Sequence, residues 1–126
     1  DVYRDSNDVW KLEDTGLPLN GKYEDEDEKH IRHFKNGKYH NENGPAFIRK
    51  DGLKEYNINN KTHRIDGPAV IYPNGEYTWY VNDYHIDNEI MNDWLEANDI
   101  PLDWVEWTNS DKKKFANYWT KKYGTP

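Results

Sequence analysis

Residues 40–48 read His-Asn-Glu-Asn-Gly-Pro-Ala-Phe-Ile, and residues 63–71 read His-Arg-Ile-Asp-Gly-Pro-Ala-Val-Ile. The two stretches share His, Gly, Pro, Ala and Ile at an offset of 23 residues, which also relates Tyr56 to Trp79. Self-similarity at a fixed period of about 20 to 50 residues is typical of proteins built from repeated supersecondary units. We therefore expect this repeat to decide the fold.

Turn dipeptides divide the repeat region into short strands. Each begins with Asn or Asp, and they are spaced 15, 8, 15 and 8 residues apart, at positions 36–37, 51–52, 59–60, 74–75 and 82–83. Asn-Gly and Asp-Gly favour the type I′ turn, whose twist matches that of a β-hairpin. Each dipeptide therefore predicts a reversal of the chain, and the shorter spacing predicts strands at 53–58 and 76–81.

Side-chain alternation gives the two strands one inward face. Tyr56 and Ile58, and then Trp79 and Val81, point to the same side of an alternating strand, and we expect that side to be the core. The longer arms each contain a Gly-Pro corner, where glycine bends freely and proline fixes φ and donates no hydrogen bond. The positions expected to hold the repeat together are His40, Gly44, Pro45, Tyr56, His63, Gly67, Pro68 and Trp79.

The segments on either side of the repeats differ from them. Residues 1–30 predict a hairpin around Asn20-Gly21 and an acidic loop, and residues 31–87 carry the repeats. In residues 88–126, apolar side chains at helical spacing predict one helix behind an Asp87 N-cap and a second behind a Thr108 capping box. We therefore expect one α+β domain: an antiparallel β-repeat meander of 23-residue units, followed by two C-terminal helices that cover it.

Composition agrees with one folded domain whose core is aromatic. Only 22 of the 126 residues are Leu, Ile, Val or Phe, a share that otherwise indicates disorder. Six Trp and ten Tyr compensate, because each ring buries a large apolar area. No stretch is apolar enough to span a membrane, and the first ten residues do not resemble a secretory signal.

The repeat motif resembles that of a known family. With its two His-x-x-x-Gly-Pro-Ala stretches and the Trp-Tyr-Val-Asn at 79–82, the chain resembles the H-R-x-D-G-P-A repeat proteins of tailed bacteriophages over residues 31–87. The resemblance implies MORN-like pairs of short strands and a viral origin, and it implies no activity. Asn41 in place of Arg, and Ile86 where a third His would fall, depart from the family pattern and suggest that the array ends near residue 86.

The sequence lacks the usual catalytic constellations. It has no Cys, and Ser6 and Ser110, its only serines, lie in no Gly-x-Ser-x-Gly motif. The glycines belong to turns and not to a phosphate-binding loop. His30 and His33 would face opposite sides of a strand, so we expect no metal site. We therefore expect no catalytic residue, no cofactor and no enzymatic activity.

Charge gives the clearest indication of a partner. The net charge is −7, yet residues 111–126 hold five Lys and one Asp, so residues 1–110 carry −11. An acidic surface attracts basic partners and speeds their association. The candidate protein-binding residues are Glu24, Asp25, Glu26, Asp27 and Glu28, then Trp104 and Trp107 on a connector, and Lys112, Lys113 and Lys114.

These observations favour a non-enzymatic phage accessory protein that binds and modulates or inhibits a host protein through an acidic surface, in the host cytoplasm. A host protein that handles nucleic acid, or one that serves in defence, fits such a surface. Two alternatives remain: a structural, virion- or tail-associated β-repeat protein, and a nucleic-acid binder that uses the Lys-rich C-terminal helix. The negative charge of the remaining chain opposes the latter. No membrane partner is expected.

Overall fold

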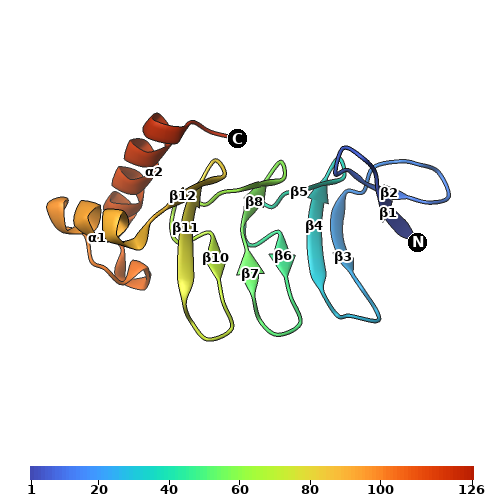
Figure 1. Cartoon of the computed structure of the whole chain (residues 1–126), viewed down its shortest axis with the longest axis horizontal. Helices are drawn as coiled ribbons and strands as arrows, with labels where there is room; N and C mark the ends of the chain where they lie inside the picture. The colour runs from blue at the N-terminus through green and yellow to red at the C-terminus, as the bar shows by residue number, and fades with distance from the viewer.

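Short antiparallel strands precede two helices in the computed structural model, which describes residues 1–126 (Figure 1). The strands are β1 (Val2–Arg4), β2 (Trp10–Leu12), β3 (Gly21–Glu24), β4 (Ile31–Lys35), β5 (Lys38–Tyr39), β6 (Phe47–Ile48), β7 (Lys54–Glu55), β8 (Asn57–Ile58), β9 (Lys61–Thr62), β10 (Val70–Ile71), β11 (Tyr77–Val81) and β12 (Tyr84–Ile86). The helices are α1 (Asn88–Ala97), a 3₁₀ turn (Trp104–Glu106) and α2 (Asn109–Tyr123).

Most strands join one antiparallel sheet in the order β12-β11-β10-β7-β6-β4-β3, with β5 added beside β4. The pairs β1–β2 and β8–β9 form two separate ribbons. Neighbouring strands are consecutive or nearly so along the chain, so the sheet is an elongated meander with both helices at its C-terminal end (Figure 1). The expected α+β class, a large antiparallel sheet followed by two helices, is confirmed.

The strand expected at 53–58 is two strands. Residues 54–55 (β7) pair with β6 and β10, whereas residues 57–58 (β8) pair only with β9. Between them, the Tyr56 N–H donates to the Ala69 carbonyl at 2.8 Å. The segment divides because the Asn59-Asn60 turn folds β8 back onto β9 while β7 stays in the main sheet.

Type I′ turns form at three of the five predicted dipeptides. Both residues have positive φ at Asn36-Gly37, Asn59-Asn60 and Asn82-Asp83. At Asp51-Gly52 and Asn74-Gly75 only the glycine does, so the prediction of type I′ turns is wrong there. The side-chain oxygens of Asp51 and Asn74 explain the difference, because each accepts the backbone N–H two residues later, at 3.2 and 3.0 Å, and holds its residue at negative φ.

The hairpin expected at Asn20-Gly21 is absent from that position. The N-terminal hairpin is β1–β2, with Val2 opposite Leu12, and Gly21 begins β3. The Asn20 side chain serves another turn, since its Oδ1 accepts the Asn36 N–H at 2.8 Å.

The sheet carries aromatic clusters on opposite faces. Directly paired residues in antiparallel strands point to the same face. Arg32 is connected with Thr78 across the sheet through the paired residues Phe47, Glu55 and Val70, so Arg32 and Thr78 point to the same face. Phe34 lies two residues beyond Arg32 and shares this face. Trp79 directly follows Thr78 and points to the opposite face.

The N-terminal cluster forms on the Phe34 face under the β1–β2 hairpin. Trp10 of β2 lies 5.9 Å from Phe34 between ring centroids, and Tyr39 stacks on Phe34 at 5.3 Å. The Arg32 guanidinium lies 5.4 Å from the ring centroids of both Trp10 and Phe47, so it joins the cluster as a cation over aromatic rings.

The C-terminal cluster forms on the Trp79 face under the two helices. Trp79 stacks on Trp107 at 5.5 Å and touches Phe115 at 5.6 Å. Its buried members are Trp79, Val81, Ile86, Met91, Leu95, Ile100, Trp107, Phe115 and Trp119. The inward orientation predicted for Trp79 and Val81 is confirmed, but Tyr56 and Ile58 are only half-buried, because no helix covers that part of the face.

The helix boundaries follow the predicted capping residues. The Asp87 side chain accepts the Glu89 N–H at 2.9 Å, and Thr108 and Asp111 form the reciprocal capping box. Gly124, at φ +85°, ends α2. Ile90 is 55 % exposed, so it does not share the buried face of α1 with Met91.

Replacing the central ring of the C-terminal cluster provides a test of the core. Trp79→Ala should destabilise the protein by about 3 to 5 kcal/mol, because the large side chain is 1 % exposed and packs on three other rings. Urea unfolding followed by tryptophan fluorescence measures the change. Tyr56→Ala, at the half-buried position 23 residues earlier, is the control and should cost less. Equal losses at both positions would contradict the conclusion that the helices bury only the Trp79 part of this face.

Candidate functional site

The acidic run lies at the free edge of the sheet. Glu24 ends β3, and residues 25–28 form the turn that leads towards β4. Strand β3 is the last strand of the sheet at the N-terminal end, far from the helices (Figure 1). Glu24, Glu26 and Asp27 are exposed and make no ion pair within 4.0 Å. This end of the molecule therefore presents carboxylates to solvent.

Asp25 differs from its neighbours because it holds the turn together. Its Oδ1 accepts the Asp27 and Glu28 N–H groups, each at 2.8 Å. These backbone hydrogen bonds, chiefly that from Glu28, lower the pKa of Asp25. Glu28 is also engaged, since its carboxylate lies 3.1 Å from His30 Nε2. The exposed acidic contacts are thus Glu24, Glu26 and Asp27.

Two further acidic residues from the N-terminal hairpin extend this surface. Asp1 and Glu13 line a hollow of 670 Å³ together with the acidic run, and no Lys or Arg lines it. Its other lining residues are Val2, Tyr23, Glu24, Asp25, Glu26 and Asp27. We call these residues the acidic surface. Sequence reasoning missed Asp1 and Glu13, because only the docking of the hairpin brings them beside the turn.

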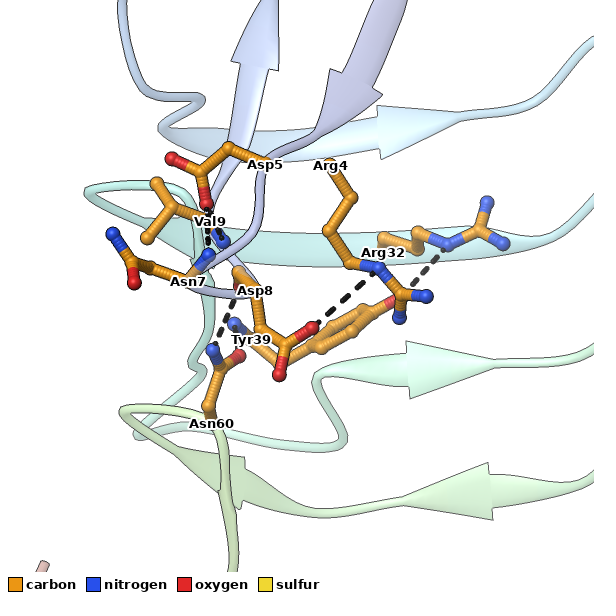
Figure 2. A network of polar contacts seen from close by, with 8 residues as sticks. All are labelled: Arg4, Asp5, Asn7, Asp8, Val9, Arg32, Tyr39 and Asn60. Carbon is orange, nitrogen blue, oxygen red and sulfur yellow. Dashed lines mark hydrogen bonds and ion pairs between the residues drawn. The ribbon is translucent and has the colours of Figure 1, made fainter.

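Polar contacts fix the hairpin in that place (Figure 2). The Asp5 carboxylate accepts the Asn7 and Val9 N–H groups and pairs with Lys11 at 2.8 Å, and the hydrogen bond from Lys11 is the main cause that lowers the pKa of Asp5 to about 2. Asn60 Nδ2 donates to the Asp8 carbonyl at 3.0 Å, as Figure 2 shows. The hairpin is therefore tied to the turn between β8 and β9, more than 50 residues away in the chain.

The lysines of α2 lie at the opposite end of the molecule. Lys113 and Lys114 are exposed, Lys112 is half-buried, and none forms an ion pair within 4.0 Å. Lys122 Nζ lies 5.6 Å from the Trp119 ring centroid, a cation–π contact. These lysines are thus a second charged surface, separate from the acidic one.

The two candidate tryptophans of the connector have different positions. Trp107 is 6 % exposed, stacks on Trp79, and donates from Nε1 to the Pro101 carbonyl at 2.8 Å. The expectation that Trp107 is an interface residue is therefore wrong, because the ring completes the core. Trp104 is half-buried, and the Arg64 guanidinium lies 4.8 Å from its ring centroid.

The repeat histidines support tight turns. His40 Nδ1 accepts the Asn59 N–H at 3.1 Å, and His63 Nδ1 accepts the Asn82 N–H at 2.9 Å. Their partners are turns of the following hairpins, and neither ring forms a hydrogen bond to its own Gly-Pro corner. His40 Nε2 comes no closer than 4.0 Å to Glu42. Because Nδ1 accepts, the neutral ring carries its proton on Nε2.

A central hollow of 660 Å³ opens between the two corner loops, at residues 41–44 and 63–66. Arg64 forms one wall: its guanidinium lies 4.0 Å from the Tyr56 ring centroid, pairs with Asp66 at 2.8 Å and donates to the Pro68 carbonyl at 3.1 Å. Tyr56 and Ile58, the pair that no helix covers, form part of the floor. Within this hollow Arg64 pairs with Asp66, and Asn41 Oδ1 accepts the Asn43 N–H at 3.1 Å.

Comparison of the chain with protein-family models, with curated proteins and with solved structures finds no match. The helices of the structure are too short or too polar to cross a lipid bilayer. The assignment of a function therefore depends on the geometry and charge described above.

The His63 turn bond predicts a pH dependence of stability. Burial lowers the pKa of His63 below its usual value near 6.5, so the unfolded chain binds the proton more readily than the folded chain. The free energy of unfolding should therefore fall as the pH decreases below about 6.5, by at most about 1.4 kcal/mol per pH unit. Urea unfolding across a pH series measures the slope.

Replacement of His63 by a non-titrating acceptor provides the matched control. His63→Asn should reduce the slope, because Asn20 already performs the same role for the Asn36 N–H. His85→Asn, at an exposed histidine that accepts no backbone hydrogen bond, should leave it unchanged. An unaltered slope in the His63 variant would refute the assignment of this pH dependence to His63.

Proposed function

We propose that the chain is a non-enzymatic protein-binding module that attaches to a basic surface of a partner protein through its acidic surface. The observation that carries the proposal is the 670 Å³ hollow lined by carboxylates from two separate segments, with no basic side chain among them. Glu24, Glu26 and Asp27 are exposed and form no ion pair within the molecule. A basic partner would supply the opposite charge on binding.

The position of the acidic surface supports this role. It occupies the edge-strand end of an elongated sheet, away from the lysines of α2 (Figure 1). An acidic surface at one end orients a protein during its encounter with a basic partner and raises the association rate at low salt. A partner groove that normally holds nucleic acid has the matching charge.

We also propose that the sheet is built of 23-residue units and that the protein is a phage accessory factor acting on a host protein. Equivalent backbone hydrogen bonds at this offset support the units. His33 N–H donates to Ala46 at 2.7 Å as Tyr56 N–H donates to Ala69 at 2.8 Å. Asn41 Nδ2 donates to the Pro45 carbonyl at 3.1 Å, as Arg64 does to that of Pro68. The phage origin has only the motif resemblance in its support.

The side-chain bonds explain the departures from the family pattern under this proposal. Asn41 replaces Arg yet still provides a donor to its corner. Ile86 falls where a third His would, and it is 1 % exposed in the C-terminal cluster. No further turn follows that would need an acceptor, so an apolar residue is suited to the end of the array.

A second candidate is binding of nucleic acid by α2. The lysines at 112–114 have no ion-pair partner and oppose the positive end of the helix dipole. Such a surface would contact phosphates, and the affinity would fall with salt. The acidic remainder of the chain weakens this candidate.

Charge neutralisation tests the proposal. The variant Glu24→Gln, Glu26→Gln, Asp27→Asn removes the exposed carboxylates and keeps Asp25, which holds the turn. A partner is first isolated with the intact chain from a bacterial host lysate, and its association rate is then measured over a salt series. We expect the rate at low salt to fall at least about tenfold, with a weaker salt dependence.

The variant Lys112→Gln, Lys113→Gln, Lys114→Gln is the matched control, and it should retain the wild-type rate. Unchanged binding in the acidic variant would reject the acidic surface as the contact. Loss of binding in the lysine variant, or capture of nucleic acid alone, would support the second candidate instead.

A further inference from the structure

The chain contains Asn-Gly dipeptides at four places, 20–21, 36–37, 43–44 and 74–75. Asn-Gly is the sequence in which an asparagine side chain most readily reacts with the backbone that follows it, since glycine offers no side chain to obstruct the approach. The reaction needs a free side-chain amide and a free glycine N–H. Hydrogen bonds to either group therefore protect the dipeptide.

Three of the four dipeptides are protected in the fold. Asn20 Oδ1 accepts the Asn36 N–H at 2.8 Å. The Gly37 N–H donates to the Leu19 carbonyl at 2.7 Å, and Gly37 is packed against Val9 and Trp10. At the last dipeptide, Asn74 Oδ1 accepts the Glu76 N–H at 3.0 Å, and the Gly75 N–H donates to Tyr72 at 2.9 Å.

Asn43-Gly44 has neither protection. Asn43 is exposed and its side chain makes no hydrogen bond, and the Gly44 N–H has no partner in the protein. The only bond of Asn43 comes from its backbone N–H, which donates to Asn41 Oδ1 at 3.1 Å and does not involve a reacting group. We propose that Asn43 is a deamidation site, selected from four equivalent dipeptides by the hydrogen bonding of the fold.

The chemistry requires only water. The Gly44 backbone nitrogen attacks Asn43 Cγ, a bond forms between them, the Cγ–Nδ2 bond breaks, and ammonia leaves with the proton from the Gly44 nitrogen. Water then opens the resulting succinimide ring. Attack of water at Cγ gives aspartate at position 43, and attack at the main-chain carbonyl gives isoaspartate. The net change is the conversion of an amide into a carboxylate.

The product adds a negative charge at the rim of the central hollow. Asn43 lines that hollow beside Glu42 and opposite the second corner loop. The residue 23 positions later is Asp66, which is neutralised by Arg64 at 2.8 Å. Asn41 occupies the position equivalent to Arg64, so a carboxylate at position 43 has no arginine to pair with. Deamidation therefore changes the charge of the hollow with time and without an enzyme, independently of the acidic surface.

Peptide mapping by mass spectrometry tests the proposal. The full chain is incubated in mildly alkaline buffer, and the conversion of each Asn-Gly is measured over time. In the folded protein, Asn43 should convert about tenfold faster than Asn20, Asn36 and Asn74, because each of those must first break a hydrogen bond. In concentrated denaturant the four rates should become similar. Equal rates in the folded chain, or an advantage of Asn43 that persists after unfolding, would overturn the proposal.

Gly44→Ala tests whether the reaction depends on the absence of a side chain at residue 44. Gly44 does not have positive φ, and an added Cβ would meet only Asn41 Nδ2, at an ordinary contact distance of 3.6 Å. The variant should therefore fold normally, which its unfolding transition verifies, while conversion at Asn43 falls to the rate of the protected sites. An unchanged rate in the folded variant would show that the missing side chain at residue 44 does not set the reactivity of Asn43, and it would refute the proposal.

Discussion

The fold depends on acceptors for the first backbone N–H of each tight turn. Each such N–H, at Asn36, Asn59 and Asn82, is bonded to a side chain from an earlier part of the chain, and the acceptors are Asn20, His40 and His63. Strands of two to five residues form few ladder bonds of their own. Each of these hydrogen bonds contributes about 0.5 to 1.5 kcal/mol, and together they connect each hairpin to the part of the chain before it.

Aromatic rings then stabilise the two ends of the sheet in different ways. At the N-terminal end, a two-stranded ribbon brings Trp10 onto Phe34. At the C-terminal end, two helices bring Trp107 and Phe115 onto Trp79. The hairpin and the helices lie on opposite faces of the sheet, and the buried residues between the two clusters are small or isolated, such as Ala46, Leu53 and Ala69. This arrangement leaves one edge strand and one hollow free for contacts.

Local patterns in the sequence predicted the elements well, and long-range placement poorly. The helix caps at Asp87 and Thr108 were predictable because their donors and acceptors lie within a few residues. The burial of Trp107 was not, because it depends on how a connector meets the sheet. The same holds for the acidic surface. The acidic run at 24–28 is evident from the sequence, but Glu13 joins it only because the N-terminal hairpin docks there, and the local spacing of residues does not predict that docking.

The opposite placement of the two aromatic clusters has a consequence for cooperativity. No ring of the Trp10 cluster contacts a ring of the Trp79 cluster, so the two cores are coupled only through short strands and turn hydrogen bonds. The hydrophobic free energy of one core does not depend directly on the integrity of the other. The N-terminal ribbon is attached by the packing of Trp10 on Phe34, by the Trp10 N–H bond to the Gly37 carbonyl and by the Asn60 bond to Asp8, so its opening would break no contact of the helix-covered core.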